Sequence, residues 1–389
     1  IPVFLNLPCI IKLMSRILII GAGLSGATLA ERFANHGDSV LVIDKRAHLA
    51  GNCYDHLDRG TGIRVSNYGA HLFHTNSQEV WDYLQKFIKW QPYEHQVLVK
   101  VKNQLLNLPI NLNTINQFFH LQLKNAEEMR SFLAKKTKKL KNVKNSEDYV
   151  LSQVGSELYE AIFQNYSLKQ WTLDPSELDA EVIKRNPLRF NSDNRYFTDR
   201  HQALPVGGFE ALVKKMLSHQ NIELRLKTDF FAFREQNDLS QFDQIFYTGA
   251  IDQYFDYAYG HLEYRSLDFH FETHDLEFYQ ENSAVNYPSL DYPFTRIIEY
   301  KYFYPPKKPL AKTIISKEYP TWDGEPYYPV PRERNHLLLK KYLREAKKLE
   351  ASGIYFVGRL GTYRYLNMDQ AVAEALKLFE KVKTQKKLA

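Results

Sequence analysis

Three glycines in the spacing Gly21-x-Gly23-x-x-Gly26 are the residues of this chain whose types and spacing point most directly to chemistry. The first position of such a pattern permits a tight turn, the second lets the backbone approach a pyrophosphate, and the third lets a helix lie close to a sheet. Asp44, further along, can accept hydrogen bonds from a ribose diol. Together these residues predict a binding site for a dinucleotide.

The elements around the glycines are those that such a site requires. Residues 16–20 and 39–43 are short, β-branched apolar runs, which predict strands buried on both faces. Residues 27–34 read as a helix of small residues. The N-terminus of this helix offers free N–H groups and a partial positive charge to phosphates. The stretch alone leaves open whether the dinucleotide is NAD or FAD.

Composition limits the function classes. A hydrophobic content of 44% over 389 residues predicts a globular chain of two or three domains, and no apolar run reaches the ~20 residues that a membrane span needs. The two cysteines, Cys9 and Cys53, indicate a reducing cytoplasm rather than a disulfide framework. A net charge of +6 suits an anionic ligand and does not indicate nucleic acid. Residues 1–13 are interpreted as an N-terminal extension outside the fold.

The later segments predict further domains inserted into the first one. Residues 95–108 alternate as a hairpin, the region from 110 to 184 is rich in helix, and residues 264–304 read as an antiparallel sheet. Thr114 and Ser146 are candidate helix caps.

Two late buried strands, 243–249 and 354–359, each contain or end near a glycine and are expected to rejoin the first sheet. A discontinuous nucleotide domain of this kind favours FAD over NAD. The N-terminus of a last helix near Asp369 could face the flavin ring.

His71 and His74 lie three residues apart in a loop rich in glycine and phenylalanine. They lack a Cys or Glu at ligand spacing, so we expect no metal site. A loop packed against a ring system suits them better.

From these motifs onward, the chain resembles the bacterial UDP-galactopyranose mutases. The matching segments run from the glycine pattern to the last helix: 69–75, 108–112, 169–171, 182–185, 295–299, 317–319, 326–329 and 357–365. The resemblance implies an α/β fold with a discontinuous Rossmann-like FAD-binding domain, an inserted helical domain and an antiparallel β-sheet domain.

We expect the following boundaries for these domains. The FAD-binding domain comprises 14–78, 202–252 and 347–389; the helical domain comprises 109–186, with a mobile substrate loop at about 171–186; the sheet domain comprises 79–108, 187–201 and 253–346.

The resemblance also implies an activity. Such enzymes interconvert UDP-galactopyranose and UDP-galactofuranose for cell-surface glycan biosynthesis, with N5 of reduced FAD as the nucleophile on the anomeric carbon and no net redox change. The implied partners are UDP-galactose and an external reductant such as NAD(P)H, without nucleic acid or a membrane span. A cytoplasmic location is expected, and a homodimer is one assembly compatible with the resemblance.

Site residues follow from the matching motifs. Catalytic roles fall to Arg185 and Arg296, which would hold the diphosphate, and to His74 beside the flavin. The substrate-binding residues would be Phe163, Tyr166, Trp171, Tyr196, Asn286, Glu318, Tyr328, Tyr365 and Asn367. The cofactor-binding residues would be Gly21, Gly23, Gly26, Asp44, Gly358, Arg359, Met368 and Asp369.

Three positions depart from the family pattern. Thr172 stands where glycine is usual, Asn367 where aspartate is common, and Ile162 where phenylalanine is frequent. An alternative that shares the glycine pattern and the discontinuous fold is an FAD-dependent redox enzyme of the amine oxidase-like class. A nucleotide-sugar binding protein without catalysis is a weaker alternative, because it gives the flavin no role.

Overall fold

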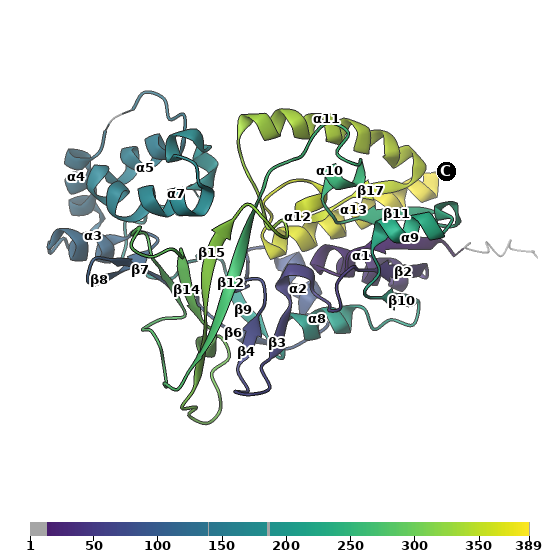
Figure 1. The fold of residues 1–389 in the computed structure, drawn as a ribbon, viewed down its shortest axis with the longest axis horizontal. Helices are drawn as coiled ribbons and strands as arrows, with labels where there is room; N and C mark the ends of the chain where they lie inside the picture. Colours follow the sequence, from purple (N-terminus) through teal and green to yellow (C-terminus); the bar gives the residue numbers. More distant parts are fainter. Residues whose placement is uncertain (1–13, 139, 185–186, 389) are drawn as a thin grey trace, which may run out of the picture.

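The computed structural model describes residues 14–138, 140–184 and 187–388. A five-stranded parallel sheet is assembled from distant segments of the chain (Figure 1). Its order is β10 (Ile222–Arg225), β2 (Ser39–Ile43), β1 (Arg16–Ile20), β11 (Gln244–Tyr247) and β17 (Ile354–Phe356). The two late strands therefore do rejoin the first sheet, as their sequences predict.

The apolar run of β1 is continuous because both faces of the strand are covered. Ile17 and Ile19 face the cluster that contains α1 (Leu24–His36), whereas Leu18 and Ile20 face α9 (Phe230–Gln236). On the α1 side lies α13 (Met368–Leu388), against which α1 packs through the Phe33 and Phe379 rings, 5.0 Å apart.

The second large sheet has seven strands and is antiparallel except where β13 pairs with β7. Its order is β16 (Tyr328–Pro329), β12 (Tyr264–His274), β15 (Thr313–Thr321), β14 (Arg296–Glu299), β13 (Ala284–Asn286), β7 (Val97–Val101) and β8 (Gln104–Leu108). The predicted hairpin and the predicted late sheet are thus one sheet, and Lys102 in the hairpin turn takes a positive φ of 52°.

A helical region lies at one end of the molecule in Figure 1, beyond the seven-stranded sheet. It contains α3 (Leu112–Phe119), α4 (Ala126–Lys136), α5 (Ser146–Val154), α6 (Ser156–Leu158), a π-helical turn (Tyr159–Gln164) and α7 (Asn165–Trp171). The predicted fold class is confirmed, and the finer domain boundaries stay a prediction.

The two predicted caps of this region are wrong by a few residues. Asn111, not Thr114, caps α3: its side chain accepts from the Thr114 N–H at 3.0 Å, and Thr114 Oγ1 accepts from the Asn111 N–H at 3.2 Å. Asn145, not Ser146, caps α5 and accepts from the Asp148 N–H at 2.8 Å. Asparagine caps as well as serine or threonine, so the sequence offered competing candidates within one turn.

The remaining strands form two small antiparallel sheets. One pairs β3 (Asp55–Leu57) with β4 (Arg64–Ser66), and the other places β9 (His201–Pro205) between β5 (Phe73–Thr75) and β6 (Trp90–Pro92).

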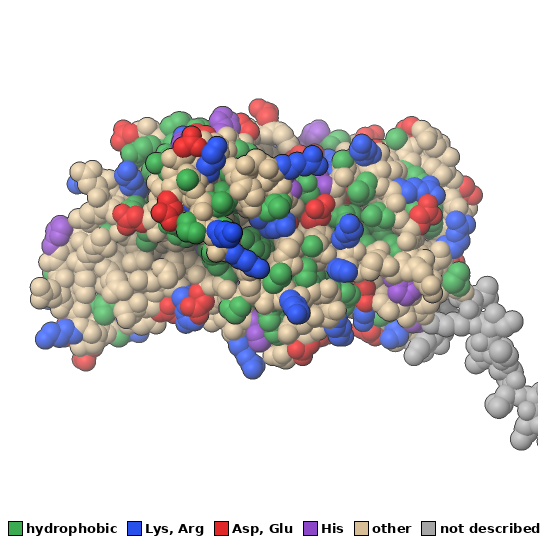
Figure 2. Space-filling model, turned by 90° about the horizontal axis from the view of Figure 1, so that it is seen from below, with side chains coloured by type: hydrophobic (Ala, Val, Ile, Leu, Met, Phe, Trp, Pro, Cys, Tyr) green, Lys and Arg blue, Asp and Glu red, His purple; other side chains and the backbone are tan. Residues whose placement is uncertain are grey.

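The other helices complete the chain. They are α2 (Gln78–Gln85), α8 (Gly208–Met216), α10 (Ile251–Tyr254), α11 (Glu333–Leu349) and α12 (Gly358–Gly361). In the described part of the chain, no helix is both long and apolar enough to cross a membrane. The predicted extension, residues 1–13, lies outside the described residues. On the face drawn in Figure 2, basic and acidic side chains are interspersed, in keeping with the mild net charge of +6.

Candidate active site

A cavity opens at the carboxyl ends of the parallel strands, in front of α1. Gly21, Gly23 and Asp44 line it. Gly23 is the N-cap of α1 and provides no side-chain cap, and the first turn of α1 carries no acidic residue, so the N–H groups of this turn can bind an anion. The buried Asp44 carboxylate accepts from the Ala22 and Arg46 N–H groups, both at 2.8 Å. These two bonds fix its orientation beside the cavity.

The three glycines meet different constraints. Gly21 has a φ of +110°, and a Cβ at Gly26 would lie 1.9 Å from the Gly21 carbonyl oxygen, so the fold itself requires both glycines. A Cβ at Gly23 would meet no protein atom closer than Gly51 Cα at 3.8 Å. The space in front of Gly23 is therefore open to a ligand.

Segments late in the chain complete the cavity. Gly358, Arg359, Asn367 and Met368 line it, whereas Asp369 is not among its lining residues. Arg359 donates to the Leu366 carbonyl at 2.6 Å, a contact with a neutral acceptor that leaves the positive charge available to an anion.

Asp369 instead serves the fold. Its carboxylate accepts from Thr75 Oγ1 at 2.9 Å and from the Gln370 N–H at 2.8 Å at the start of α13. An uncapped helix N-terminus, an open glycine, a fixed carboxylate and a cation are the groups that a dinucleotide needs, so the residues present fit FAD.

Arg296 is the centre of a second cluster, built by strand register. Asn286 and Glu318 lie directly opposite Arg296 on its two neighbouring strands. The Arg296 Nε donates to Asn286 Oδ1 at 2.9 Å, Nη2 to Tyr166 Oη at 3.3 Å, and Nη1 lies 3.9 Å from Glu318 Oε2. A strand therefore fixes this guanidinium, and about a third of the side chain remains exposed.

The surroundings of the cluster favour the charged form of Arg296 and disfavour that of Glu318. Burial raises the pKa of the Glu318 carboxyl, although the Arg296 charge opposes this. Burial also lowers the pKa of Arg296, but the surrounding Tyr166, Glu318, Tyr196 and Tyr328 outweigh it, and the net direction is upward. An arginine that keeps its charge, surrounded by tyrosines, suits a phosphate group.

Two tyrosines connect this cluster to the cofactor cavity. The rings of Tyr328 and Tyr365 stack with centroids 5.6 Å apart and planes at 12°. The Arg359 guanidinium lies 4.6 Å from the Tyr365 ring centroid and 5.7 Å from that of Tyr328. Arg359 lines the cofactor cavity, and the charge of Arg296 acts on the pKa of Tyr328. The cofactor cavity and the Arg296 cluster therefore adjoin.

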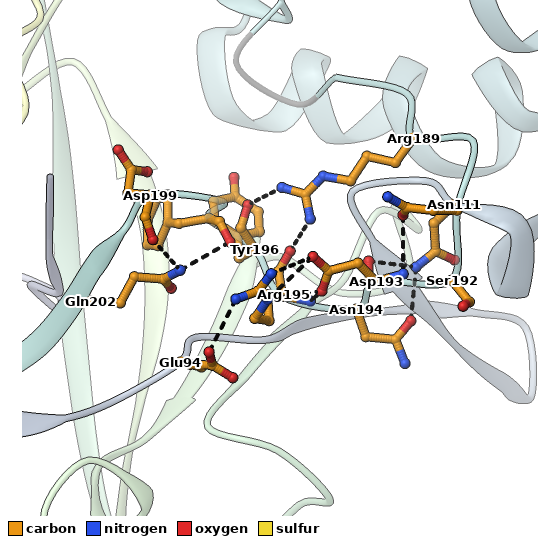
Figure 3. A network of polar contacts seen from close by, with 12 residues as sticks. Glu94, Asn111, Arg189, Ser192, Asp193, Asn194, Arg195, Tyr196, Asp199 and Gln202 are labelled. Atoms are coloured by element: carbon orange, nitrogen blue, oxygen red, sulfur yellow. Dashed lines mark hydrogen bonds and ion pairs between the residues drawn. The ribbon is translucent and has the colours of Figure 1, made fainter. Parts of the chain in front are cut away.

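A polar network holds the segment that carries Tyr196 (Figure 3). The Arg189 guanidinium donates to the carbonyls of Arg195 and Tyr196, the latter at 2.8 Å. Arg195 pairs with Asp193 through Nε and Nη2, and the Tyr196 N–H donates to the His95 carbonyl at 2.6 Å. These bonds fix the backbone of Tyr196.

His74 lies on β5 and is oriented from two sides. Its Nδ1 is 3.0 Å from Asp199 Oδ2, and its ring stacks on Phe197 with centroids 3.7 Å apart. When Nδ1 carries the proton donated to Asp199, Nε2 carries the lone pair.

His95 is a residue of this region that the sequence reasoning missed. It is 6% exposed, and no hydrogen-bond partner of its Nδ1 is found among the described residues. Burial lowers the pKa of His95 to about 3, and the charges of Arg296 and His74 act in the same direction. No motif in the sequence marks this histidine.

Helix α7 and the turn before it hold the other predicted substrate residues. Tyr166 meets Arg296, and Trp171 ends the helix. Phe163 lines a small apolar cavity with Tyr149, among other residues. Arg185, the predicted partner of Arg296, lies outside the described residues.

Comparison with known proteins adds independent findings. A family model described as UDP-galactopyranose mutase matches residues 161–365, and one described as an NAD(P)-binding Rossmann-like domain matches residues 19–87. A probable UDP-galactopyranose mutase of Klebsiella pneumoniae is 41% identical over 93% of each chain. A dTDP-fucopyranose mutase of Escherichia coli is 38% identical over 93% of this chain and 97% of its own. The crystal structure of a reduced UDP-galactopyranose mutase superposes with a TM-score of 0.76 over 96% of each chain at 15% identity, which shows the fold.

Proposed function

Because the chain belongs to the UDP-galactopyranose mutase family of isomerases, we propose that it interconverts UDP-galactopyranose and UDP-galactofuranose. The observation that carries the proposal is the Arg296 cluster, in which a strand-fixed guanidinium among tyrosines adjoins a dinucleotide cavity. A redox enzyme of the amine oxidase-like class requires the cavity, but its chemistry gives no role to a diphosphate site beside it.

The cavity would hold FAD through groups already described. The N-terminus of α1 and Arg359 would bind the pyrophosphate, and Asp44 the ribose. When bound and reduced, the flavin supplies N5 as a nucleophile for the anomeric carbon, and an external reductant such as NAD(P)H would keep it reduced. His74 has its Nδ1 held by Asp199, and a place beside the flavin is what the family resemblance implies for it.

Arg296 would act on the leaving group. The bond between the anomeric carbon and the diphosphate oxygen breaks, and negative charge accumulates on the diphosphate. A fixed guanidinium stabilises this charge more in the transition state than in the ground state. Tyr166, Tyr196 and Tyr328 would donate hydroxyl hydrogen bonds to phosphate oxygens, and Arg185 would approach the diphosphate from the substrate loop.

A second candidate substrate comes from the comparisons. The relative from Escherichia coli, named a dTDP-fucopyranose mutase, is almost as similar to this chain as the mutase from Klebsiella pneumoniae. Both names describe a mutase that acts on the pyranose form of a nucleoside diphosphate sugar. A thymidine-linked 6-deoxy sugar is therefore the alternative to test.

The decisive experiment is turnover with a defined redox state. The dithionite-reduced protein is incubated separately with UDP-galactopyranose and dTDP-fucopyranose, and the two ring forms are separated by chromatography. We expect isomerisation of the UDP sugar by the reduced protein only, without net use of electrons. Preference for the dTDP sugar would assign the second candidate. Oxidation of a donor in proportion to turnover, without a furanose product, would indicate the redox enzyme.

Replacement of Arg296 tests its role directly. A charge-assisted hydrogen bond to phosphate contributes roughly 1.5–3 kcal/mol, so Arg296→Ala should lower kcat on the order of 10- to 100-fold. The affinity for UDP should fall far less, and the flavin should remain bound. Arg185→Ala should show the same pattern, with a large loss of kcat, a small loss of UDP affinity and retained flavin. The exposed Arg225, paired with Glu223 on β10, is the matched control. A wild-type kcat in Arg296→Ala would remove this residue from the assignment.

A further inference from the structure

Lys169 on α7 points its ammonium into a ring of backbone carbonyls. Its Nζ donates to the carbonyls of Ser289 at 2.9 Å, Tyr292 at 3.0 Å and Phe294 at 2.8 Å, and also contacts that of Tyr287. We call this set the Lys169 cage. All four carbonyls belong to the loop that joins β13 to β14.

The cage holds the Lys169 ammonium with carbonyl oxygens rather than with a carboxylate. Among the described residues, the hydrogen bonds of the Lys169 ammonium are with backbone carbonyls rather than carboxylates, and its side chain is partly buried. An ammonium group has three N–H donors, and its removal from water is costly unless acceptors replace the water. The four carbonyls, whose negative ends converge, supply this replacement. Without the ammonium, the carbonyls would lose the donor that they share.

The cage connects α7, which carries Tyr166, to the loop between β13 and β14, the strands that carry Asn286 and Arg296. The 287–295 loop begins after Asn286 and ends before Arg296, which are opposite each other in the sheet. Tyr166 precedes Lys169 by one helical turn on the same face of α7, and its hydroxyl accepts from Arg296. The contact between the Lys169 ammonium and the loop therefore fixes where the Tyr166 hydroxyl meets the guanidinium.

A second cation holds the same end of α7. The buried Arg265 on β12 donates from Nε to the Gln170 carbonyl at 2.6 Å and from Nη2 to the Lys169 carbonyl at 3.3 Å. The last carbonyls of a helix carry partial negative charge, which this arginine offsets. Arg265 fixes the helix to β12, whereas Lys169 fixes it to the loop that directly precedes Arg296.

We propose that Lys169 is a positioning residue for the diphosphate site: its ammonium joins α7 to the β13–β14 loop and so orients Arg296 through Tyr166. The consequence for turnover rests on the proposed function. The structural part does not, because the cage joins the two elements whatever ligand the site binds.

The test compares Lys169→Met with Lys169→Gln and with a matched lysine. Lys301, at the opposite end of β14 from Arg296, also donates to carbonyls, those of Glu277, Leu310 and Lys312. Lys301→Met therefore measures how the loss of an ammonium among carbonyls affects stability and kcat at a place away from the site. Each variant is prepared with bound flavin, and hydrogen exchange of residues 287–295 and 165–171 is measured beside kcat and KM.

Lys169→Met should speed exchange in both segments and lower kcat on the order of 10- to 100-fold with little change in KM, since a small displacement of a charge costs mainly the transition state. Lys169→Gln, which keeps two donors, should lie between it and the wild type. Lys301→Met should keep kcat within about twofold even if its Tm falls.

Unchanged exchange in Lys169→Met would overturn the proposal, as would an equal loss of kcat in Lys301→Met. If Lys169→Met does not fold, Lys169→Gln decides by the same two criteria. If the wild type isomerises neither sugar, the proposed function is contradicted. If Lys169→Met nevertheless exchanges faster, the tether of α7 to the loop still stands.

Discussion

At the scale of single residues, the two arginines Arg359 and Arg296 have partners that set their direction without cancelling their charge. Arg359 donates to backbone carbonyls, and Arg296 to an amide oxygen and a hydroxyl, with its nearest carboxylate oxygen 3.9 Å away. Neutral acceptors orient a guanidinium and leave its charge for an anion. This is the arrangement expected of a site that binds phosphates.

The glycine pattern gives a prediction at this scale. Gly23→Val should abolish flavin binding and leave the stability of the apoprotein unchanged, because its backbone is extended and its side chain would meet only the space proposed for the pyrophosphate. Gly26→Ala should instead destabilise the apoprotein by about 1–3 kcal/mol, since its methyl group would overlap the Gly21 carbonyl. Visible absorbance and urea unfolding separate the two effects. A yellow Gly23→Val protein would show that the cofactor is placed wrongly.

At the scale of elements, α7 is the helix on which the site depends. It carries Tyr166, Lys169 and Trp171 within seven residues, and its C-cap, Thr172, takes a left-handed conformation with a φ of 49°. A β-branched residue is strained there, whereas glycine adopts a left-handed C-terminal conformation without this cost. The Thr172 hydroxyl offsets part of the strain by accepting from Trp322 Nε1 at 2.5 Å.

Substitutions at Thr172 separate these two effects. Thr172→Gly should raise the free energy of unfolding by up to about 1 kcal/mol, because the relief of roughly 1–2 kcal/mol of left-handed strain exceeds the net contribution of the two exposed hydrogen bonds of the Thr172 hydroxyl, to the Trp171 carbonyl and from Trp322 Nε1. Thr172→Ala should lower it, because the strain stays and the hydroxyl is lost. Urea unfolding checks both. If alanine proves as stable as glycine, the conformation of the C-cap is not what limits this helix.

At the scale of the whole molecule, both sites are assembled from segments that are distant in the chain. The parallel sheet unites strands from residues 16 to 356, and the Arg296 cluster unites α7 with three strands of the other sheet. Two histidines near the sites have lowered pKa values, and His95 is the buried one of the two. Burial lowers the pKa of His71 to about 4 and that of His95 to about 3.

This burial predicts acid sensitivity of the whole fold. An unfolded histidine takes up a proton as the pH falls through ~6.5, whereas these two do so in the folded state only near 4 and 3. The unfolded state therefore binds more protons between pH 6.5 and 4, so the free energy of unfolding falls in this window, by up to about 1.4 kcal/mol per pH unit for each histidine.

Urea unfolding of the holoprotein at several pH values measures this slope. His95→Asn should make this slope shallower by the contribution of about one proton taken up on unfolding. Substitution of the exposed His270, the control, should leave it as it is. Parallel slopes in His95→Asn and the wild type would contradict a neutral, buried His95.

The sequence alone determined the dinucleotide fold and the family. The β-branched runs, the glycine spacing and Asp44 are local signals, because strand propensity, a tight turn and a helix N-terminus each depend on neighbours in the chain. The motifs with Arg296, Tyr328 and Arg359 predict site residues, and both their involvement and their roles stay predictions.

Only the tertiary structure decided which side chains meet. Asn286, Arg296 and Glu318 form a row because strand pairing places them opposite one another, and no spacing along the chain encodes that register. Likewise, the bond of Asp369 to Thr75, the burial of His95 and the Lys169 cage depend on long-range packing. Pattern reasoning detects what neighbouring residues impose on one another, whereas these contacts exist only after distant elements have packed together.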